Sequence, residues 1–279
     1  MENKIKYKLI LCDLDQTLLI NNHIPSFNIE AIKKAQEKGV KFIICTGRNF
    51  DYMCHLLNEI NTENSENEYT ICNSGSTIYE NKNKKLIYFK GLDYEILNLV
   101  FEYGKKIKDI FMIFDTFDGA FVYNDEVLDK ENFPNFKYTP IRSLEDMKHT
   151  KIIRVIYSKN DFDYLKNIQN KIQKEKCFDG KVSYYISSNR FLEFNSYGVD
   201  KGEALKWISN YLKIDIKETI AIGDNYNDES MIKVAGLGCC VKSANEDIKR
   251  ISQYICEKDY FEGSVKEVIE NFILSDLSK

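Results

Sequence analysis

A short aliphatic run that ends in two aspartates is the feature that most constrains the fold of this chain. The run Leu9–Cys12 is apolar throughout and leads directly into Asp13, Asp15 and Thr17. Such a run indicates a strand buried on both faces, as in a parallel sheet. Because open α/β sheets bind ligands at the carboxyl ends of their strands, we expect the two carboxylates to lie at a binding edge. Taken alone, the pair is equally compatible with a turn in which aspartates cap the backbone.

Three later segments repeat this arrangement, in which polar side chains follow a predicted element boundary. In chain order they supply Thr46, Gly47 and Arg48 after the run Val40–Cys45, Lys201 at the start of a predicted helix, and Asp224, Asn227 and Asp228 after the run Thr219–Gly223. Each boundary by itself has an ordinary explanation as a turn or a helix start. Four of them in one chain indicate a shared binding edge.

The side chains at these boundaries have the chemistry needed to transfer a phosphoryl group. A carboxylate can attack phosphorus and divide hydrolysis into two easier steps, while a second carboxylate carries the proton. Because an anion attacks an anion, positive charge is needed nearby, and a lysine, backbone amides and Mg²⁺ can supply it. An EF-hand calcium loop starting at Asp224 is excluded, because its sixth position is Glu229 and its twelfth is Ala235. A Walker-type phosphate loop is also absent from the sequence.

In the order and spacing of these motifs the chain resembles the haloacid dehalogenase superfamily, specifically its Cof-type phosphatases with a large inserted cap. The resemblance extends over essentially the whole chain. It implies a role for each motif residue: Asp13 as nucleophile, Asp15 as general acid–base, Thr46, Gly47, Lys201 and Asn227 as phosphate ligands, Asp13, Asp224, Asp228 and the backbone carbonyl of Asp15 as Mg²⁺ ligands, and Arg48 and Asn73 as substrate contacts. Arg48 is equally compatible with capping a helix.

The chain departs from the pattern of this family in two places. Gln16 stands where the family has the glycine of D-x-D-G-T, and Ser74 stands where the family has the glycine after Asn73. Glycine reaches backbone conformations that other residues adopt only at a cost. We therefore expect an altered loop geometry after Asp15 or an altered turnover. The charged positions of the four motifs are all retained, which argues against an inactive relative.

Alternation of strands and helices predicts an α/β fold for both ends of the chain. Predicted helices 27–37 and 50–60 alternate with strands in the first third, which implies a parallel sheet with right-handed crossovers. The middle of the chain has an α+β pattern and carries none of the four motifs. We therefore predict a Rossmann-like, parallel-sheet core over 1–82 and 190–279 with an inserted α+β cap domain over 83–189.

The composition excludes several classes of protein. With 43% hydrophobic and 29% charged residues among 279, the chain is globular rather than disordered. Its net charge of −4 argues against a nucleic-acid partner, and no apolar stretch approaches the roughly 20 residues of a membrane span. We expect no signal peptide, since the first apolar run is too short. The eight cysteines contain no C-x-x-C pair, so we expect reduced thiols and a cytoplasmic location.

These observations together predict a Mg²⁺-dependent phosphatase. Its expected substrate is a small phosphorylated metabolite, hydrolysed through an aspartyl-phosphate intermediate, and the resemblance implies a sugar phosphate or a phosphorylated cofactor. In the family that the chain resembles, the cap closes over the site and contacts the rest of the substrate. A phosphomutase of the same superfamily and a non-catalytic phosphometabolite sensor remain open as alternatives, and both a monomer and a homodimer are compatible with the sequence.

Overall fold

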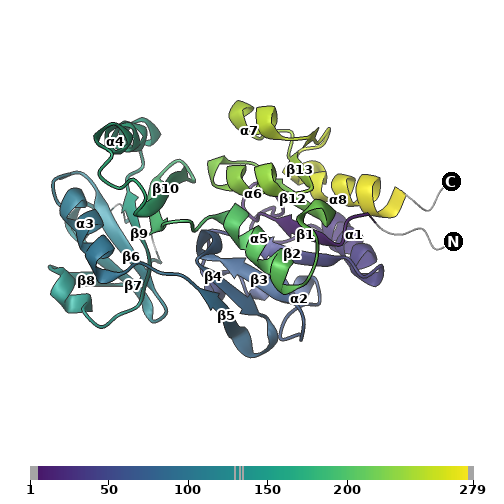
Figure 1. Ribbon diagram of the computed structural model, residues 1–279, viewed down its shortest axis with the longest axis horizontal. Coiled ribbons are helices and arrows are strands. Elements are labelled where there is room, and N and C mark those ends of the chain that lie inside the picture. Colours follow the sequence, from purple (N-terminus) through teal and green to yellow (C-terminus); the bar gives the residue numbers. More distant parts are fainter. Residues whose placement is uncertain (1–5, 129, 132, 134, 276–279) are drawn as a thin grey trace. The chain divides into compact units, whose positions relative to one another are not determined.

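The chain divides into two compact units, each described here by itself (Figure 1). The computed structural model describes residues 6–275 except 129, 132 and 134. The first unit contains the described residues up to Phe89 and those from Asp200 onward, and the second is Lys90–Val199. The predicted fold class, a parallel-sheet α/β core with an inserted α+β unit, is confirmed.

An eight-stranded sheet forms the centre of the first unit. Its strands are β1 (Leu9–Cys12), β2 (Lys41–Cys45), β3 (Tyr69–Cys72), β4 (Thr77–Glu80), β5 (Lys85–Phe89), β12 (Thr219–Gly223), β13 (Leu237–Cys240) and β14 (Tyr254–Ile255). They lie in the order β14-β13-β12-β1-β2-β3-β4-β5. The strands from β14 to β3 are parallel, whereas β4 and β5 pair antiparallel. The apolar run that opens the sequence is therefore a central strand, which explains its complete burial.

Helices cover both faces of this sheet (Figure 1). They are α1 (Ser26–Glu37), α2 (His55–Glu59), α5 (Lys201–Tyr211), α6 (Glu229–Val234), α7 (Glu246–Ile251) and α8 (Ser264–Ile269). Successive residues of a strand point to opposite faces. Accordingly Ile10 belongs to the apolar cluster that includes Ile32 of α1, while Leu11 belongs to the one that includes Leu205 of α5. The sheet is thus buried between two helical layers, and its strand ends are left to form a site.

The second unit is an antiparallel sheet with two helices. Its strands β6 (Phe111–Thr116), β7 (Gly119–Tyr123), β8 (Tyr138–Ile141), β9 (Ile152–Ser158), β10 (Val182–Ser187) and β11 (Phe191–Ser196) lie in the order β10-β11-β9-β6-β7-β8. Among the described pairings within this second sheet, the β7–β8 pair alone is parallel. Helices α3 (Tyr94–Gly104) and α4 (Phe162–Glu175) pack against it through a shared apolar cluster that includes Phe101, Leu165 and Phe194.

Two details differ from the sequence-based predictions. The inserted unit begins at Lys90 rather than 83 and ends at Val199 rather than 189, because β5 pairs with β4 in the first sheet and β11 pairs with β9 in the second. The predicted helix 50–60 is a short 3-10 turn followed by α2, since the backbone leaves helical geometry at Met53, where φ is −130°.

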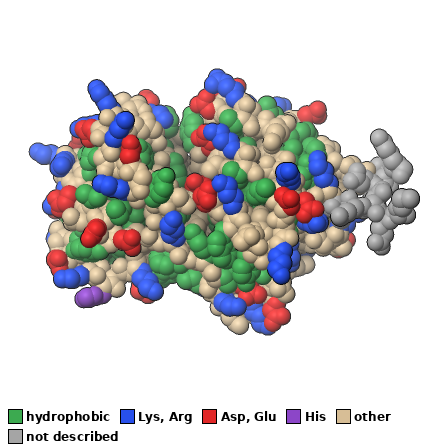
Figure 2. Space-filling view, in the orientation of Figure 1, with side chains coloured by type: hydrophobic (Ala, Val, Ile, Leu, Met, Phe, Trp, Pro, Cys, Tyr) green, Lys and Arg blue, Asp and Glu red, His purple; other side chains and the backbone are tan. Residues whose placement is uncertain are grey.

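The surface carries charges of both signs. On the face drawn in Figure 2, Lys and Arg side chains are interspersed with Asp and Glu side chains. Within the described residues, the helices are all too short or too polar to cross a membrane.

Candidate active site

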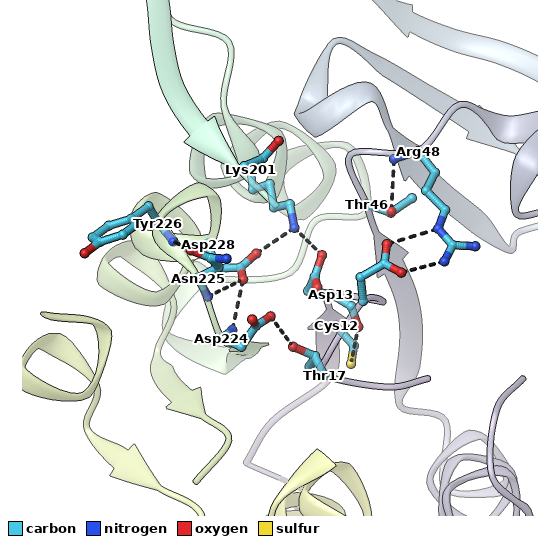
Figure 3. A network of polar contacts seen from close by, with 12 residues as sticks. Cys12, Asp13, Thr17, Thr46, Arg48, Lys201, Asp224, Asn225, Tyr226 and Asp228 are labelled. Atoms are coloured by element: carbon cyan, nitrogen blue, oxygen red, sulfur yellow. Dashed lines mark hydrogen bonds and ion pairs between the residues drawn. The ribbon is translucent and has the colours of Figure 1, made fainter. Parts of the chain in front are cut away.

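The central strands bring three of the four motifs to one edge of the first sheet. In the register of the parallel pairs, Cys12 of β1 lies opposite Ile44 of β2 and Ile222 of β12. The residues that follow these strands, Asp13 and Thr46 among them, therefore meet at the carboxyl edge (Figure 3). The backbone amide of Asp13 donates to the carbonyl of Ile222 at 2.9 Å, which continues the sheet pairing into the site.

Lys201 adds a buried cation to this edge. It is the first residue of α5 and is 0% exposed. Its ammonium Nζ donates to a carboxylate oxygen of Asp13 and, at 2.6 Å, to one of Asp228 (Figure 3). Burial by itself lowers the pKa of a lysine, but the carboxylates of Asp13 and Asp228 outweigh it and raise the pKa of Lys201 well above its usual value. The side chain is therefore a permanent positive charge.

Three buried aspartates lie close together at this edge. One carboxylate oxygen from each of Asp13, Asp224 and Asp228 lies within 4.8 Å of the other two. Burial raises the pKa of Asp13 to about 7, and the charge of Asp228 adds to this effect while Lys201 opposes it. Burial and the charge of Asp228 likewise raise the pKa of Asp224 well above its usual value. The site thus holds more negative charge than its one lysine can neutralise, which suits a bound cation.

Asp228 is committed to organising the loop after β12. One of its oxygens accepts from Lys201, and the other accepts from the backbone amides of Asp224 and Asn225 at 2.9 and 3.1 Å. Asp224 is oriented by Thr17, whose hydroxyl donates to its carboxylate at 2.9 Å. Because Thr17 follows β1, this bond joins the first and last motifs directly.

Asp15 lies at the solvent side of the site, with a side chain 54% exposed. Both of its carboxylate oxygens accept from the guanidinium of Arg48, with Nε at 3.0 Å and Nη2 at 2.5 Å. The remaining Nη1 of Arg48 donates to Asn22 at 2.6 Å. A bidentate arginine–carboxylate pair of this kind has a defined direction as well as strength. Arg48 therefore sets where the Asp15 carboxylate points.

The other predicted site residues are close in the chain to these groups. Thr46 is 1% exposed, and its hydroxyl accepts from the backbone amide of Arg48 at 3.1 Å. Gly47 and Asn227 are half-buried in the loops after β2 and β12. Asn73 is fully buried, its side-chain amide donates to Thr77 at 3.0 Å, and its side-chain oxygen accepts no hydrogen bond within the described part of the chain. A substrate contact by Asn73 remains a prediction.

Sequence reasoning assigned no role to two of the residues that build this site. Thr17 belongs to the first motif, but the sequence identifies no partner for its hydroxyl, because Asp224 lies 207 residues away in the chain. Asn22 carried no signal, because its partner Arg48 lies 26 residues away in the chain. Both acquire their function through contacts between loops.

Gln16 adopts a left-handed backbone conformation, with a φ of +61°. This conformation raises the free energy of the folded state by about 1–2 kcal/mol for an L-residue. For glycine, the larger loss of backbone entropy on folding costs about 0.5–1 kcal/mol. We therefore expect Gln16→Gly to raise the free energy of unfolding by up to about 1 kcal/mol in urea titrations, with kcat within about twofold of wild type.

The control is Gln36→Gly, because Gln36 lies in the last turn of helix α1 and its side-chain amide donates to the carbonyl of Ile60 at 3.4 Å. There the same substitution should lower the free energy of unfolding by about 1 kcal/mol, from the lower helix propensity of glycine and the lost hydrogen bond. Equal losses in both variants would contradict a strained backbone at Gln16.

Comparison with known proteins agrees with this geometry. The family model for haloacid dehalogenase-like hydrolases matches residues 10–269. Phosphatase YwpJ of Bacillus subtilis is 28% identical, over 89% of this chain and 94% of that protein. A phosphoglycolate phosphatase of Methanobrevibacter smithii is 27% identical, over 95% and 98%.

Solved structures give the same result. A haloacid dehalogenase-like hydrolase from Bacteroides thetaiotaomicron has a TM-score of 0.76 at 28% identity, with 95% of this chain and 99% of that chain covered. Another from B. subtilis has a TM-score of 0.81 over 95% and 100% of the two chains, at 19% identity, which shows the shared fold alone. The prediction made from the four motifs is confirmed, and this chain belongs to the haloacid dehalogenase-like hydrolases.

Proposed function

We propose that this protein is a Mg²⁺-dependent phosphatase that hydrolyses small phosphorylated metabolites through an aspartyl-phosphate intermediate. The observation that carries the proposal is the pairing of the buried Asp13 carboxylate with the fully buried Lys201 at the carboxyl edge of the sheet. A carboxylate in this position is a nucleophile whose charge is balanced where a phosphate would approach. Phosphate monoesters need such help, because their uncatalysed hydrolysis is among the slowest reactions known.

Each of the site residues has a defined role in this mechanism. Asp13 attacks phosphorus, and the bond from phosphorus to the leaving oxygen breaks as the new bond forms. Thr46, Gly47, Asn227 and Lys201 hold the phosphoryl oxygens through hydroxyl, amide and ammonium donors. Asp15 protonates the departing alkoxide and then removes a proton from the water that hydrolyses the intermediate. Each carboxylate oxygen accepts one hydrogen bond from Arg48 and keeps a second lone pair, which is available for this proton.

The residues at the site fit a hard divalent cation. Asp13, Asp224 and Asp228 with Lys201 carry a net charge of −2 when all are ionised, and their oxygens are the ligands that Mg²⁺ prefers. Asp13, Asp224 and the backbone carbonyl of Asp15 would hold the ion, and Asp228 would support this shell from its position against Lys201. A bound Mg²⁺ supplies positive charge that reduces repulsion between carboxylate and phosphate.

We propose that the inserted unit determines the substrate specificity, as the cap does in the Cof-type family. The names of relatives suggest the chemical range: one is a phosphoglycolate phosphatase, and another is a phosphatase of a ribitylamino-uracil phosphate. A sugar phosphate or phosphorylated cofactor is therefore the expected class. The eight free thiols support a reducing, cytoplasmic location. The protein is expected to act as a monomer or a homodimer.

The test is phosphate release from an aryl phosphate and from a panel of sugar, nucleotide and cofactor phosphates. Chelation of divalent cations is expected to reduce release to background, and added Mg²⁺ is expected to restore it. An isomerised sugar phosphate without free phosphate would instead identify a phosphomutase. Tight binding of phosphorylated metabolites without turnover of any panel member would contradict the phosphatase and favour the sensor.

A further inference from the structure

The position of the Lys201 ammonium depends on where helix α5 begins. Lys201 is the first residue of that helix, and Asp200 caps it by accepting from the backbone amides of Gly202 and Glu203 at 2.8 and 2.9 Å. The ammonium has to reach Asp13 and Asp228 together. A displacement of the helix start by a few tenths of an ångström therefore moves the cation at the nucleophile.

A tight turn lies against one side of this helix start. Gly75 has a φ of +102°, and a Cβ added to it would lie 2.5 Å from the backbone oxygen of Asp200. The same turn is tied to the loop after β2, because the amide of Ser74 donates to the carbonyl of Thr46 at 2.9 Å. The turn thus joins the backbone of the predicted phosphate loop to the residue that precedes Lys201.

Helix α6 lies against the other side of the helix start. A Cβ added to Gly202 would lie 2.6 Å from the backbone oxygen of Ser230, and the Gly202 amide donates to the Ser230 hydroxyl at 2.9 Å. Ser230 follows the loop that carries Asp228 by two residues. Gly202, which follows Lys201, is therefore in contact with Ser230, two residues after Asp228. Asp228 is the second partner of the Lys201 ammonium.

We propose that Gly75 and Gly202 are positioning residues that set Lys201 against Asp13 and Asp228 through backbone contacts on both sides of the α5 start. The inference rests on the proposed function of the same site. Each contact is closer than a residue with a Cβ permits. Glycine at both positions therefore lets the turn at Gly75, the start of α5 and the start of α6 stay at their observed distances from one another. Misplacement of a catalytic group by about 1 Å can cost on the order of 10²-fold in rate.

The first experiment compares Gly75→Ala with Gly39→Ala. Gly39 also has a positive φ, +81°, but a Cβ there would meet no atom within 4 Å. Both variants carry the backbone strain, and only Gly75→Ala closes on Asp200. At a temperature where both are folded, we expect kcat to fall by about tenfold or more in Gly75→Ala and by less than about twofold in Gly39→Ala. A folded Gly75→Ala with wild-type kcat would overturn the proposal.

A second pair of variants applies if Gly75→Ala does not fold. Asp200→Ala removes the cap and loosens the helix start, whereas asparagine is an equally good cap. We expect kcat to fall by about threefold or more in Asp200→Ala and to be restored in Asp200→Asn, with KM changing less than kcat. Loss of kcat in both variants, or in neither, would contradict positioning through the helix start.

The positioning of Lys201 and the proposed phosphatase activity can be tested by separate measurements. A wild-type protein without turnover of any phosphate ester would contradict the phosphatase. The affinity for orthophosphate, measured by calorimetry, then tests the positioning by itself: it should weaken in Gly75→Ala and Asp200→Ala and stay unchanged in Gly39→Ala and Asp200→Asn. Equal affinities in all variants, or no orthophosphate binding by the wild type, would overturn the positioning as well.

Discussion

Replacing Asp13 with asparagine is expected to abolish phosphate release from every ester that the wild-type protein hydrolyses. The substitution preserves size and leaves one oxygen that can accept from Lys201, but it removes the negative charge and the nucleophilic oxygen anion, so the covalent step cannot occur. Loss of a nucleophile costs kcat about 10⁴-fold or more. Phosphate release under saturating substrate and Mg²⁺ measures this loss, and the wild-type enzyme should also accumulate an acid-stable phosphoryl label that the variant lacks.

The same substitution should make the metal-free protein more stable at alkaline pH. Burial, with the charges of Asp228 and Asp15 added and Lys201 opposing, raises the pKa of Asp13 from 3.8 to about 7. The folded state therefore binds this proton more tightly than the unfolded state, so wild-type stability falls as pH rises from about 4 through 7. The Asp13→Asn variant has no such loss. Its gain in unfolding free energy should be on the order of a few kcal/mol at pH 8 and close to zero near pH 4.

Asp51→Asn is the matched control for both measurements. Asp51 lies in the same unit, exposed, where it pairs with Lys84. Its replacement should leave kcat unchanged. It should change the free energy of unfolding by less than about 0.5 kcal/mol at both pH 4 and pH 8. Residual turnover of Asp13→Asn within about tenfold of wild type would rule out Asp13 as the nucleophile.

Replacing Lys201 with methionine is expected to damage both activity and stability. The side chain is 0% exposed and forms two ion pairs, so its removal leaves Asp13 and Asp228 without a cation in a buried site. Breaking a buried pair by removing one partner typically costs about 3–5 kcal/mol. Urea unfolding of the metal-free protein at pH 8 measures the cost. This cost should be smaller at pH 5, because burial raises the pKa of Asp13 to about 7 and its protonation removes the repulsion with Asp228.

The expected loss of kcat in Lys201→Met is about 10²–10³-fold, since the ammonium stabilises charge that develops on the phosphoryl oxygens. Lys206→Met is the matched control, because Lys206 lies on the same helix with an exposed side chain paired to Glu203. It should lose less than about 0.5 kcal/mol and retain its activity. A Lys201→Met protein as stable at pH 8 as Lys206→Met would contradict the buried ion-pair network.

The sequence by itself determined the α/β class, the family and which motifs meet at the site. Burial in a parallel sheet produces short apolar runs such as Leu9–Cys12, and the side chains that follow such runs are brought to one edge by the fold. These are local properties, so Asp13, Thr46 and Asp224 could be placed together from their positions relative to the predicted strands. The inserted unit was also visible, because its pattern of elements differs from that of the flanking segments.

The boundaries of that unit were decided by strand pairing. Nothing local distinguishes β5, at the edge of the first sheet, from a strand of the inserted unit. Only the pairing of β5 with β4 assigns it to the core. The bidentate contact of Arg48 with Asp15 was also decided by tertiary structure. The sequence left Arg48 equally compatible with capping a helix, and the distance between the loops after β1 and β2 allows the contact with Asp15.

The contacts that orient the site were decided in the same way by tertiary structure. Thr17 and Asp224 are 207 residues apart in the chain, and Lys201 and Asp13 are 188 apart. The approach of Gly75 to Asp200 depends on how one turn and one helix pack on the same sheet. Hydrogen bonds and backbone contacts of this kind depend on distances of a few tenths of an ångström between segments that are remote in sequence. Such distances follow from the packing of the whole unit, which no local pattern of residues records.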